Sequence, residues 1–387
     1  METTSPAARH DSLDLSALRT AIAAEQGITQ HFKKWRNYAF VLAGIGVGIT
    51  LVSLFVATFS RTVAVKTLQF MLAGLIGYLI LMFTAYSIML YRRHRAFVKR
   101  LADCAPDFIP PAQRWESVPL LAVIPIWGIL LVISATFFQD GLALVMGIGV
   151  MLFALFFAYS YLIRWVYVGG LARTNQFLAI FPYHLVLLAN KAAILINAAR
   201  LDEALQILRS LLERPRRRNI YLIPVLLNNY GYCLSMMDRY NESLPLLEAA
   251  VRLSPSLNYI YFALASWYLE QNLDPERALE FTEIGLEIVK PNDAPLLASG
   301  RAMSARALAL TGRDTRAEAI LTQALEAAPR LLAPANAGVQ HEAGHARLAQ
   351  NKREAAFEHF NKAVELDPNG IYGKLAQRAL DSLTTPP

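Results

Sequence analysis

The stretch NNYGYCLSMMDRYNESLPLLEAAVRLSP, from Asn228 to Pro255, predicts two helices joined by a short polar turn. Two antiparallel helices approach closely only where one of them presents little bulk, and Gly231 and Ala250 are such small residues. Pro255 ends the second helix, because proline cannot continue the hydrogen-bond ladder. The stretch therefore indicates a helical hairpin as the building unit of the second half of the chain.

The same stretch resembles a tetratricopeptide repeat, with Gly231, Tyr240, Ala250 and Pro255 at that family's characteristic positions. Other segments can be laid over it. The small residue of the first helix is matched by Ala192, Gly231, Ala265, Ala305 and Gly344. The small residue early in the second helix is matched by Ala204, Ser243, Ala278, Ala317 and Ala356. The closing proline is matched by Pro215, Pro255, Pro291, Pro329 and Pro368.

The resemblance implies an all-α fold in which residues 171–387 form an α-solenoid of five helix-turn-helix repeats. We expect a capping helix at residues 369–383, which would shield the last apolar face from water. Thr282, Gly285 and Arg347 depart from the larger or apolar residues that the family has there. The five repeats are expected at residues 185–215, 224–257, 258–291, 298–329 and 337–368.

The first half of the chain is far more apolar than the second. Four windows carry no formal charge and are long enough to cross a bilayer as helices. They predict a four-helix transmembrane domain over residues 39–168, after a polar N-terminal segment of residues 1–38. The windows are residues 39–59, 67–91, 118–138 and 141–163.

The basic residues predict the orientation of these windows. Lysines and arginines cluster before the first window and between the second and third, and cytoplasmic loops carry such an excess. The sequence thus predicts an integral membrane protein with both termini inside, with the bacterial inner membrane as the expected location. Most of the +7 net charge lies in this half, which indicates membrane topology and argues against nucleic-acid binding.

The N-terminal segment contains a possible amphipathic helix, with Leu15, Leu18 and Ile22 along one side. It could lie at the membrane surface. The alternative is a helix that packs on the repeats.

The stretch HEAGH, from His341 to His345, matches the zinc-peptidase pattern in which two histidines bind Zn²⁺ and Glu342 is the general base. However, it lies in the first helix of the fifth repeat, where Gly344 is the small packing residue. A catalytic zinc site also needs a third protein ligand, and none stands at a recognised spacing. We therefore interpret HEAGH as part of the repeat and expect no enzyme, with the membrane-tethered metallopeptidase as the alternative.

Tetratricopeptide repeats present a concave surface to peptides or partner helices, so the resemblance implies a membrane-anchored scaffold or adaptor. No nucleotide loop or paired-cysteine metal signature appears, and no cofactor is expected. A transporter or envelope-complex subunit is a second alternative, although the four windows lack the ionisable residues that transport usually requires. The partner, the pathway and the oligomeric state are not specified by the sequence.

The frame of small residues also predicts which side chains face the concave groove. Their mixture suits a peptide or helix with apolar anchors and an acidic group near Arg306. Ala189 and Ala193 stand where part of the carboxylate clamp of some relatives would be, so an internal segment or a helix is the expected ligand. The predicted groove residues are Asn228, Tyr232, Phe262, Ser266, Arg306, His341 and His345.

Overall fold

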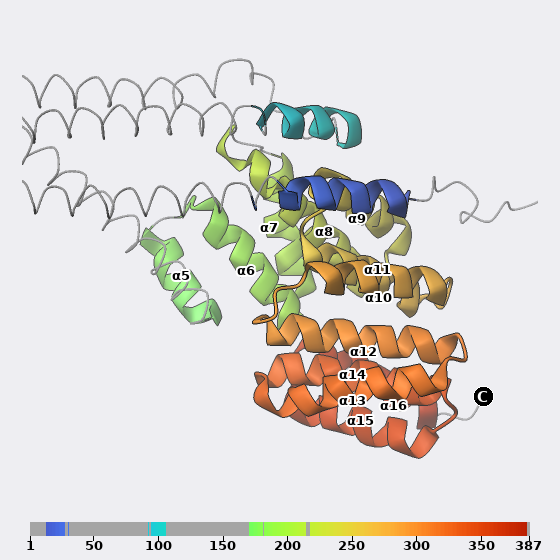
Figure 1. Cartoon of the computed structure of the whole chain (residues 1–387). Coiled ribbons are helices and arrows are strands. Elements are labelled where there is room, and N and C mark those ends of the chain that lie inside the picture. Colours follow the sequence, from blue (N-terminus) through green and yellow to red (C-terminus); the bar gives the residue numbers. More distant parts are fainter. Residues whose placement is uncertain are drawn as a thin grey trace, which may run out of the picture. The chain divides into compact units, whose positions relative to one another are not determined.

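The computed structural model describes residues 13–27, 30, 92, 94–105, 170–180, 182–213 and 217–384. Among these residues the regular structure is entirely helical (Figure 1). The chain divides into two compact units, one formed by Met1–Ile22 with Val166–Pro387 and the other by Ala23–Trp165. The second unit is described in its short helical segments at residues 23–27 and 94–104, where Arg100 forms an ion pair with Glu25 at 2.9 Å.

The predicted localisation has to be corrected. Within the part of the chain that the structure describes, no helix is long and apolar enough to cross a membrane, so an integral membrane protein with both termini inside is not supported. The longest of the labelled helices have 17 residues. At 1.5 Å per residue they span about 26 Å, short of a hydrocarbon core of about 30 Å. The four apolar windows themselves lie outside the described residues, and the transporter alternative, which depends on them, stays a prediction.

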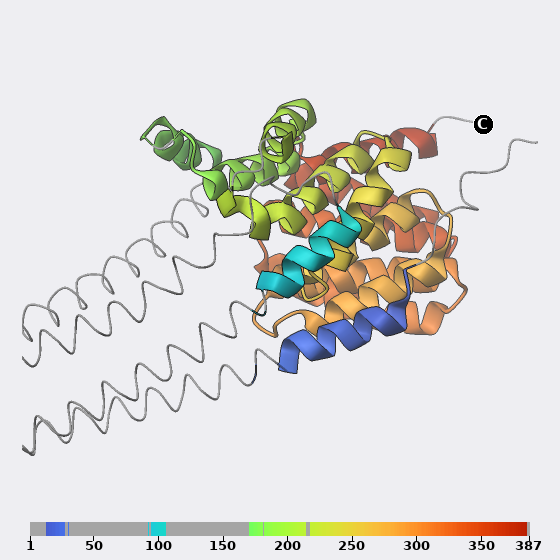
Figure 2. The ribbon, with the colours of Figure 1, turned by 90° about the horizontal axis from the view of Figure 1, so that it is seen from above.

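The first unit is a row of helical hairpins. After α5 (Gly170–Ile180), consecutive helices pair as α6 with α7, α8 with α9, α10 with α11, α12 with α13 and α14 with α15. Successive pairs pack against one another in chain order (Figures 1 and 2). The bounds are α6 Leu185–Asn197, α7 Leu201–Glu213, α8 Ile223–Met236, α9 Tyr240–Leu253, α10 Asn258–Glu270, α11 Pro275–Ile288, α12 Ala294–Leu310, α13 Asp314–Ala327, α14 Ala333–Ala349, α15 Arg353–Leu366 and α16 Ile371–Thr384, with 3₁₀ turns η4 Arg217–Leu222 and η5 Ala328–Arg330.

The turn within each pair contains one residue in the left-handed region. Asp, Asn and Gly tolerate a positive φ because they have a short polar side chain or none. Ala199 is the exception and adopts this conformation at a cost of roughly 1–2 kcal/mol. The five residues are Ala199 (φ 52°), Asp238 (60°), Asn272 (50°), Gly312 (74°) and Asn351 (60°).

Small residues set the closeness of the paired helices, as the sequence indicates. A Cβ on Gly231 would lie 2.9 Å from Leu247 Cγ, and one on Gly344 would lie 2.5 Å from Phe360 Cε1. Real Cβ contacts are almost never this short, so a side chain at either position would force Leu247 or Phe360 to shift. The alanines and the serine predicted at the equivalent positions are all at most 1% exposed: Ala192, Ala204, Ser243, Ala265, Ala278, Ala305, Ala317 and Ala356.

Two departures from the family pattern have a packing reason. A Cβ on Gly285 would lie 2.8 Å from Phe262 Cε1, so the missing side chain makes room for that ring. Thr282 is fully buried, and its hydroxyl donates to Leu279 O and accepts a hydrogen bond from Ser304 at 2.8 Å. The apolar residue expected at 282 is thus replaced by a polar contact between α11 and α12 that is fully satisfied.

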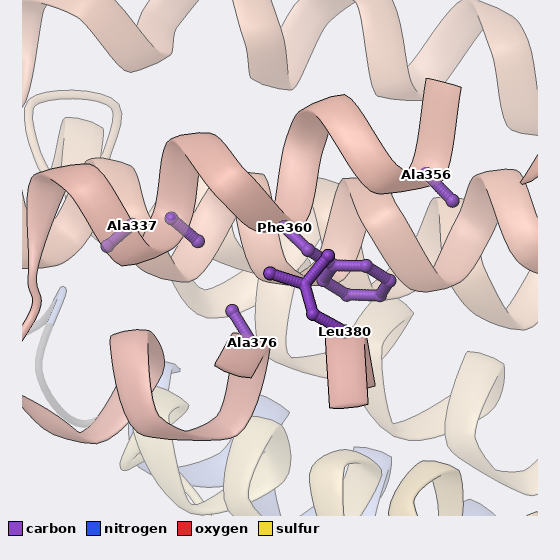
Figure 3. Packing of buried hydrophobic residues seen from close by; sticks show 6 residues of the cluster. Ala337, Ala356, Phe360, Ala376 and Leu380 are labelled. Carbon is purple, nitrogen blue, oxygen red and sulfur yellow. The ribbon is translucent and has the colours of Figure 1, made fainter. Parts of the chain in front are cut away.

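The last helix covers the end of the fifth pair. Phe360 and Ala356 of α15 pack with Ala337 of α14 and with Ala376 and Leu380 of α16 (Figure 3). Alanine is frequent in this cluster, so the helix axes come close and the single large ring of Phe360 fills the centre. Helix α16 also contacts α6, at the other end of the row of pairs.

The N-terminal helix of residues 15–27 packs, over its first part, on the repeats. Leu13, Leu18 and Ile22 are 6–7% exposed, and Leu13 O accepts a hydrogen bond from Arg277 of α11. Arg19 lies 3.8 Å from Glu287 of the same helix. These contacts join the start of the segment to α11, and its placement at a membrane surface stays a prediction.

Candidate functional site

The first helices of consecutive pairs contact one another, α6 with α8, α8 with α10, α10 with α12, and α12 with α14, and α16 follows α14. A pocket of about 210 Å³ lies among the side chains of α8, α10, α14 and α16 and the turn before α9. Because its walls come from three helix pairs and the last helix, it exists only when the hairpins are stacked. The lining residues are Ser235, Met236, Asp238, Tyr240, Glu270, His341, His345, Leu375, Arg378 and Ala379.

A buried ion network stands behind one wall of the pocket. Arg306 of α12 is 6% exposed, and its Nη1 lies 2.7 Å from Glu270 Oε1 and 3.2 Å from Glu342 Oε2. Its Nη2 donates to Leu269 O at 3.0 Å. Burial alone would lower the pKa of Arg306, but the carboxylates of Glu270 and Glu342 raise it above its ordinary value. The network therefore links α10, α12 and α14 through one guanidinium.

The HEAGH residues are part of this network. His341 is 2% exposed and its Nδ1 lies 3.3 Å from Glu342 Oε1, while its ring packs edge-on against His345 with centroids 4.7 Å apart. Burial would raise the pKa of Glu342, but Arg306, followed by His341, holds it below its ordinary range. A carboxylate engaged in this way is a poor general base.

His345 is the half-buried histidine of the pair. Its ring packs edge-on on Phe360 at a centroid distance of 5.0 Å. Burial, together with the positive charge of Arg306, lowers the pKa of His345 well below its ordinary value. Among the residues that the structure describes, no group of three His, Cys, Asp or Glu side chains is placed to hold a metal ion.

Two tyrosines join α8 to α16 beside the network. Tyr232 and Tyr372 share a side-chain hydrogen bond, and burial raises the pKa of both phenols. Tyr372 also packs over Gly338 of α14, where an added Cβ would lie 3.1 Å from its ring. Helix α16 is therefore held by polar contacts as well as by the apolar cluster around Phe360.

The structure places the seven predicted groove residues at different depths. His341 and His345 line the pocket, Arg306 lies behind it, and Tyr232 is engaged with α16. Asn228 and Ser266 are only 5% and 6% exposed. Phe262 is 6% exposed, and its ring packs on Gly285 and Gly300, so it is a core residue between α10, α11 and α12.

Sequence reasoning missed Glu270, Ser235, Asp238 and Arg378, and it considered Glu342 only as the general base of the alternative zinc site. Glu270 and Glu342 each stand 36 residues from Arg306, one repeat before and one after it, and this alternation of charge was a readable signal. Ser235, Asp238 and Arg378 gave no such signal, because Arg378 meets the other two only when α16 is placed against α8.

Comparison with known proteins agrees with this architecture. Residues 337–369 match the family model of the tetratricopeptide repeat. The match supports a tetratricopeptide-repeat protein. Such repeats generally act as scaffolds for protein–protein interaction and not as enzymes, and their groove takes peptide or protein partners. The search of curated proteins gave no match.

Several solved structures are similar to the chain. YrrB, described as a TPR protein with an unusual peptide-binding site, is 19% identical over 54% of this chain and 97% of its own, with a TM-score of 0.31. The structure titled MamA MSR-1 C2 is 20% identical over 48% of this chain and 97% of its own, also at 0.31. The P58(IPK) TPR domain is 13% identical over 96% of this chain and 98% of its own, at 0.24.

Proposed function

We propose that the protein is an interaction scaffold that binds a peptide segment of a partner in the pocket between α8, α10, α14 and α16. The observation that carries this proposal is the pocket itself, which gathers side chains from three helix pairs and α16. A ligand seated there contacts several repeats at once, which is how a solenoid turns weak local contacts into one binding surface.

The size of the pocket supports a side chain as its occupant. Sites for small-molecule ligands usually have volumes of about 300–1,000 Å³. The volume of about 210 Å³ is below that range and suits one anchoring side chain of a peptide.

The walls of the pocket are fixed before a ligand arrives. Glu270 and His341 line the pocket and are both held through the Arg306 network. The carbonyl oxygen of Tyr240 accepts a hydrogen bond from Trp267 Nε1 at 3.1 Å, which ties α9 to α10. A preformed site loses little conformational entropy on binding, so even a short segment gains useful affinity.

The test is a selection of phage-displayed random peptides on the full chain, followed by affinity measurements with pocket variants. Ala379→Phe puts a ring into the pocket and should weaken the selected peptides at least tenfold. Gln377→Phe, at an exposed position of the same helix, should leave their affinity unchanged. Circular dichroism checks that both variants keep their helical content.

Because Ala379 also contacts the core below α16, Leu375→Trp provides a second way to narrow the pocket. Peptides that bind both variants as well as they bind the parent chain would overturn the proposal.

A further inference from the structure

We propose that the pocket recognises a basic side chain, lysine or arginine, of the bound segment. This inference rests on the proposed function and adds the chemistry of the anchoring residue. Two acidic residues, Asp238 and Glu270, line the pocket together with Ser235 and Tyr240, which carry hydroxyls. An ammonium or guanidinium group brings several N–H donors, which suit such a set of oxygen acceptors.

The buried network keeps a negative excess at the pocket wall. One guanidinium, that of Arg306, is shared by the carboxylates of Glu270 and Glu342. The three side chains together carry one net negative charge, and Glu270 is the member that lines the pocket. This arrangement reverses the sequence-based expectation of an acidic ligand group near Arg306, because that arginine is already paired with two acids of its own chain.

Ser235 is a second, independent sign of a ligand. Ser235 lines the pocket and is only 2% exposed. Its Oγ has no hydrogen-bond partner among the described residues. Buried hydroxyls are nearly always paired, so such an atom is expected to meet a partner when the site is filled. A serine hydroxyl can accept a hydrogen bond from a basic side chain.

Asp238 is positioned at the rim by its backbone. It adopts a φ of 60° in the turn between α8 and α9, and its Oδ1 accepts a hydrogen bond from Tyr240 Oη at 3.1 Å. The Asp238 side chain is 67% exposed, so it remains accessible to an incoming cation.

Arg378 of α16 already places a basic group at this rim. Its Nη1 lies 3.7 Å from Asp238 Oδ2, and the side chain is 54% exposed, which makes a weak surface pair. The burial of His345 lowers its pKa and keeps that ring from adding a competing positive charge at neutral pH. A ligand cation can therefore take the place of Arg378 at low cost.

The experiment uses a peptide from the phage selection, synthesised with free lysine and with Nε-acetyl-lysine, and the full chain. Enrichment of lysine or arginine at one position is expected, and acetylation of that lysine should weaken binding about tenfold. Asp238→Asn should weaken the free-lysine peptide to a similar extent and leave the acetylated one unchanged. Asparagine tolerates a positive φ, so the turn is kept.

Two further variants separate recognition from structural damage. Arg378→Ala removes the competing cation and should tighten the free-lysine peptide a few-fold, an improvement that a damaged fold would not give. Asp381→Asn, an exposed carboxylate of α16 outside the pocket, should have no effect.

The two proposals fail in different ways. Peptides that are displaced by Ala379→Phe but are insensitive to acetylation, Asp238→Asn and Arg378→Ala would overturn the basic anchor alone. Peptides that are insensitive to Ala379→Phe and Leu375→Trp would overturn the pocket as the binding site.

Discussion

Ion pairs join neighbouring hairpins on both the inner and the outer helices, and the two sets differ in burial. The inner set, Glu270–Arg306–Glu342, connects first helices, and its side chains are 5–17% exposed. An outer pair, Arg316–Glu283, connects second helices and is 56% and 37% exposed. The sequence separations are similar, 36 residues inside and 33 outside.

The comparison teaches that the repeat spacing alone does not set the value of an ion pair. Water screens the outer pair, so either partner can be lost with little effect. The inner charges have left water, and each depends on its partners for compensation. A residue of the outer pair can therefore be replaced with little loss of stability. The three charges of the inner network, in contrast, depend on one another.

The largest effect is expected from Arg306→Met. It leaves Glu270 and Glu342 buried without their cation, and breaking a buried pair costs about 3–5 kcal/mol. Urea denaturation of the full chain, followed by circular dichroism, should show this loss. Arg316→Met is the matched outer variant and should cost at most about 1 kcal/mol.

Replacing all three residues of the inner network tests whether the loss of stability comes from uncompensated charge. With Glu270→Leu, Arg306→Met and Glu342→Leu together, no buried charge is left uncompensated, and most of the stability should return. If Arg306→Met were as mild as Arg316→Met, the inner and outer sets would be equivalent and the interpretation of burial would be wrong.

The next largest loss of stability is expected from overpacking between two helices. Gly344→Ala, on inner helix α14, places a Cβ against the ring of Phe360, and overpacking costs about 1–3 kcal/mol. Gly27→Ala is the control, because nothing lies within 4 Å of its added Cβ and alanine favours a helix. Differential scanning fluorimetry of both variants should show a lower melting temperature for Gly344→Ala only. Adding Phe360→Leu to Gly344→Ala should recover part of the lost melting temperature. No recovery would contradict the contact between the added Cβ and the ring of Phe360.

Contacts within one repeat could be predicted from the sequence, whereas contacts between repeats could not. Gly344, Ala356 and the other small residues follow a helical frame that is local to one repeat, so their burial could be predicted. The Arg306 network depends on registration between neighbouring repeats, and only its 36-residue spacing was visible. Phe262 could not be placed, because its burial depends on the missing side chains of Gly285 and Gly300 in two other helices. The pocket could not be predicted, because α16 forms part of its wall and the position of α16 also depends on a contact with α6. No repeat pattern indicates that contact.

A smaller effect is expected from pH. The folded-state pKa of His345 is below its unfolded value of about 6.5, so the unfolded chain binds the extra proton first and stability falls as pH drops below that value. The loss approaches about 1.4 kcal/mol per pH unit for one such histidine. His345→Phe keeps a ring on Phe360 and should reduce the slope of stability between pH 7 and pH 5.

His359 of outer helix α15 also has a lowered pKa, chiefly through burial, so part of the slope should remain in that variant. The carboxylates titrate mostly below this range. An unchanged slope in His345→Phe would mean that this histidine is hydrated in the folded protein.

The smallest effect belongs to the outer surface. A double-mutant cycle with Arg316→Ala and Glu283→Ala should give a coupling free energy of about 0.2–1 kcal/mol, as exposed pairs do. The coupling should disappear in about 1 M salt, where screening acts within a few ångströms. A large coupling that persists in salt would place this pair with the buried network.

The pocket is tested as the binding site by mapping where a bound peptide touches the chain. A peptide selected on the full chain is synthesised with a diazirine group beside its lysine, irradiated in complex with the unmodified protein, and the crosslinks are mapped by mass spectrometry. We predict crosslinks to the pocket residues of α8 and α16, such as Met236 and Leu375. Crosslinks confined to the outer helices α11, α13 and α15, or to residues of α9 after Tyr240, would contradict this prediction.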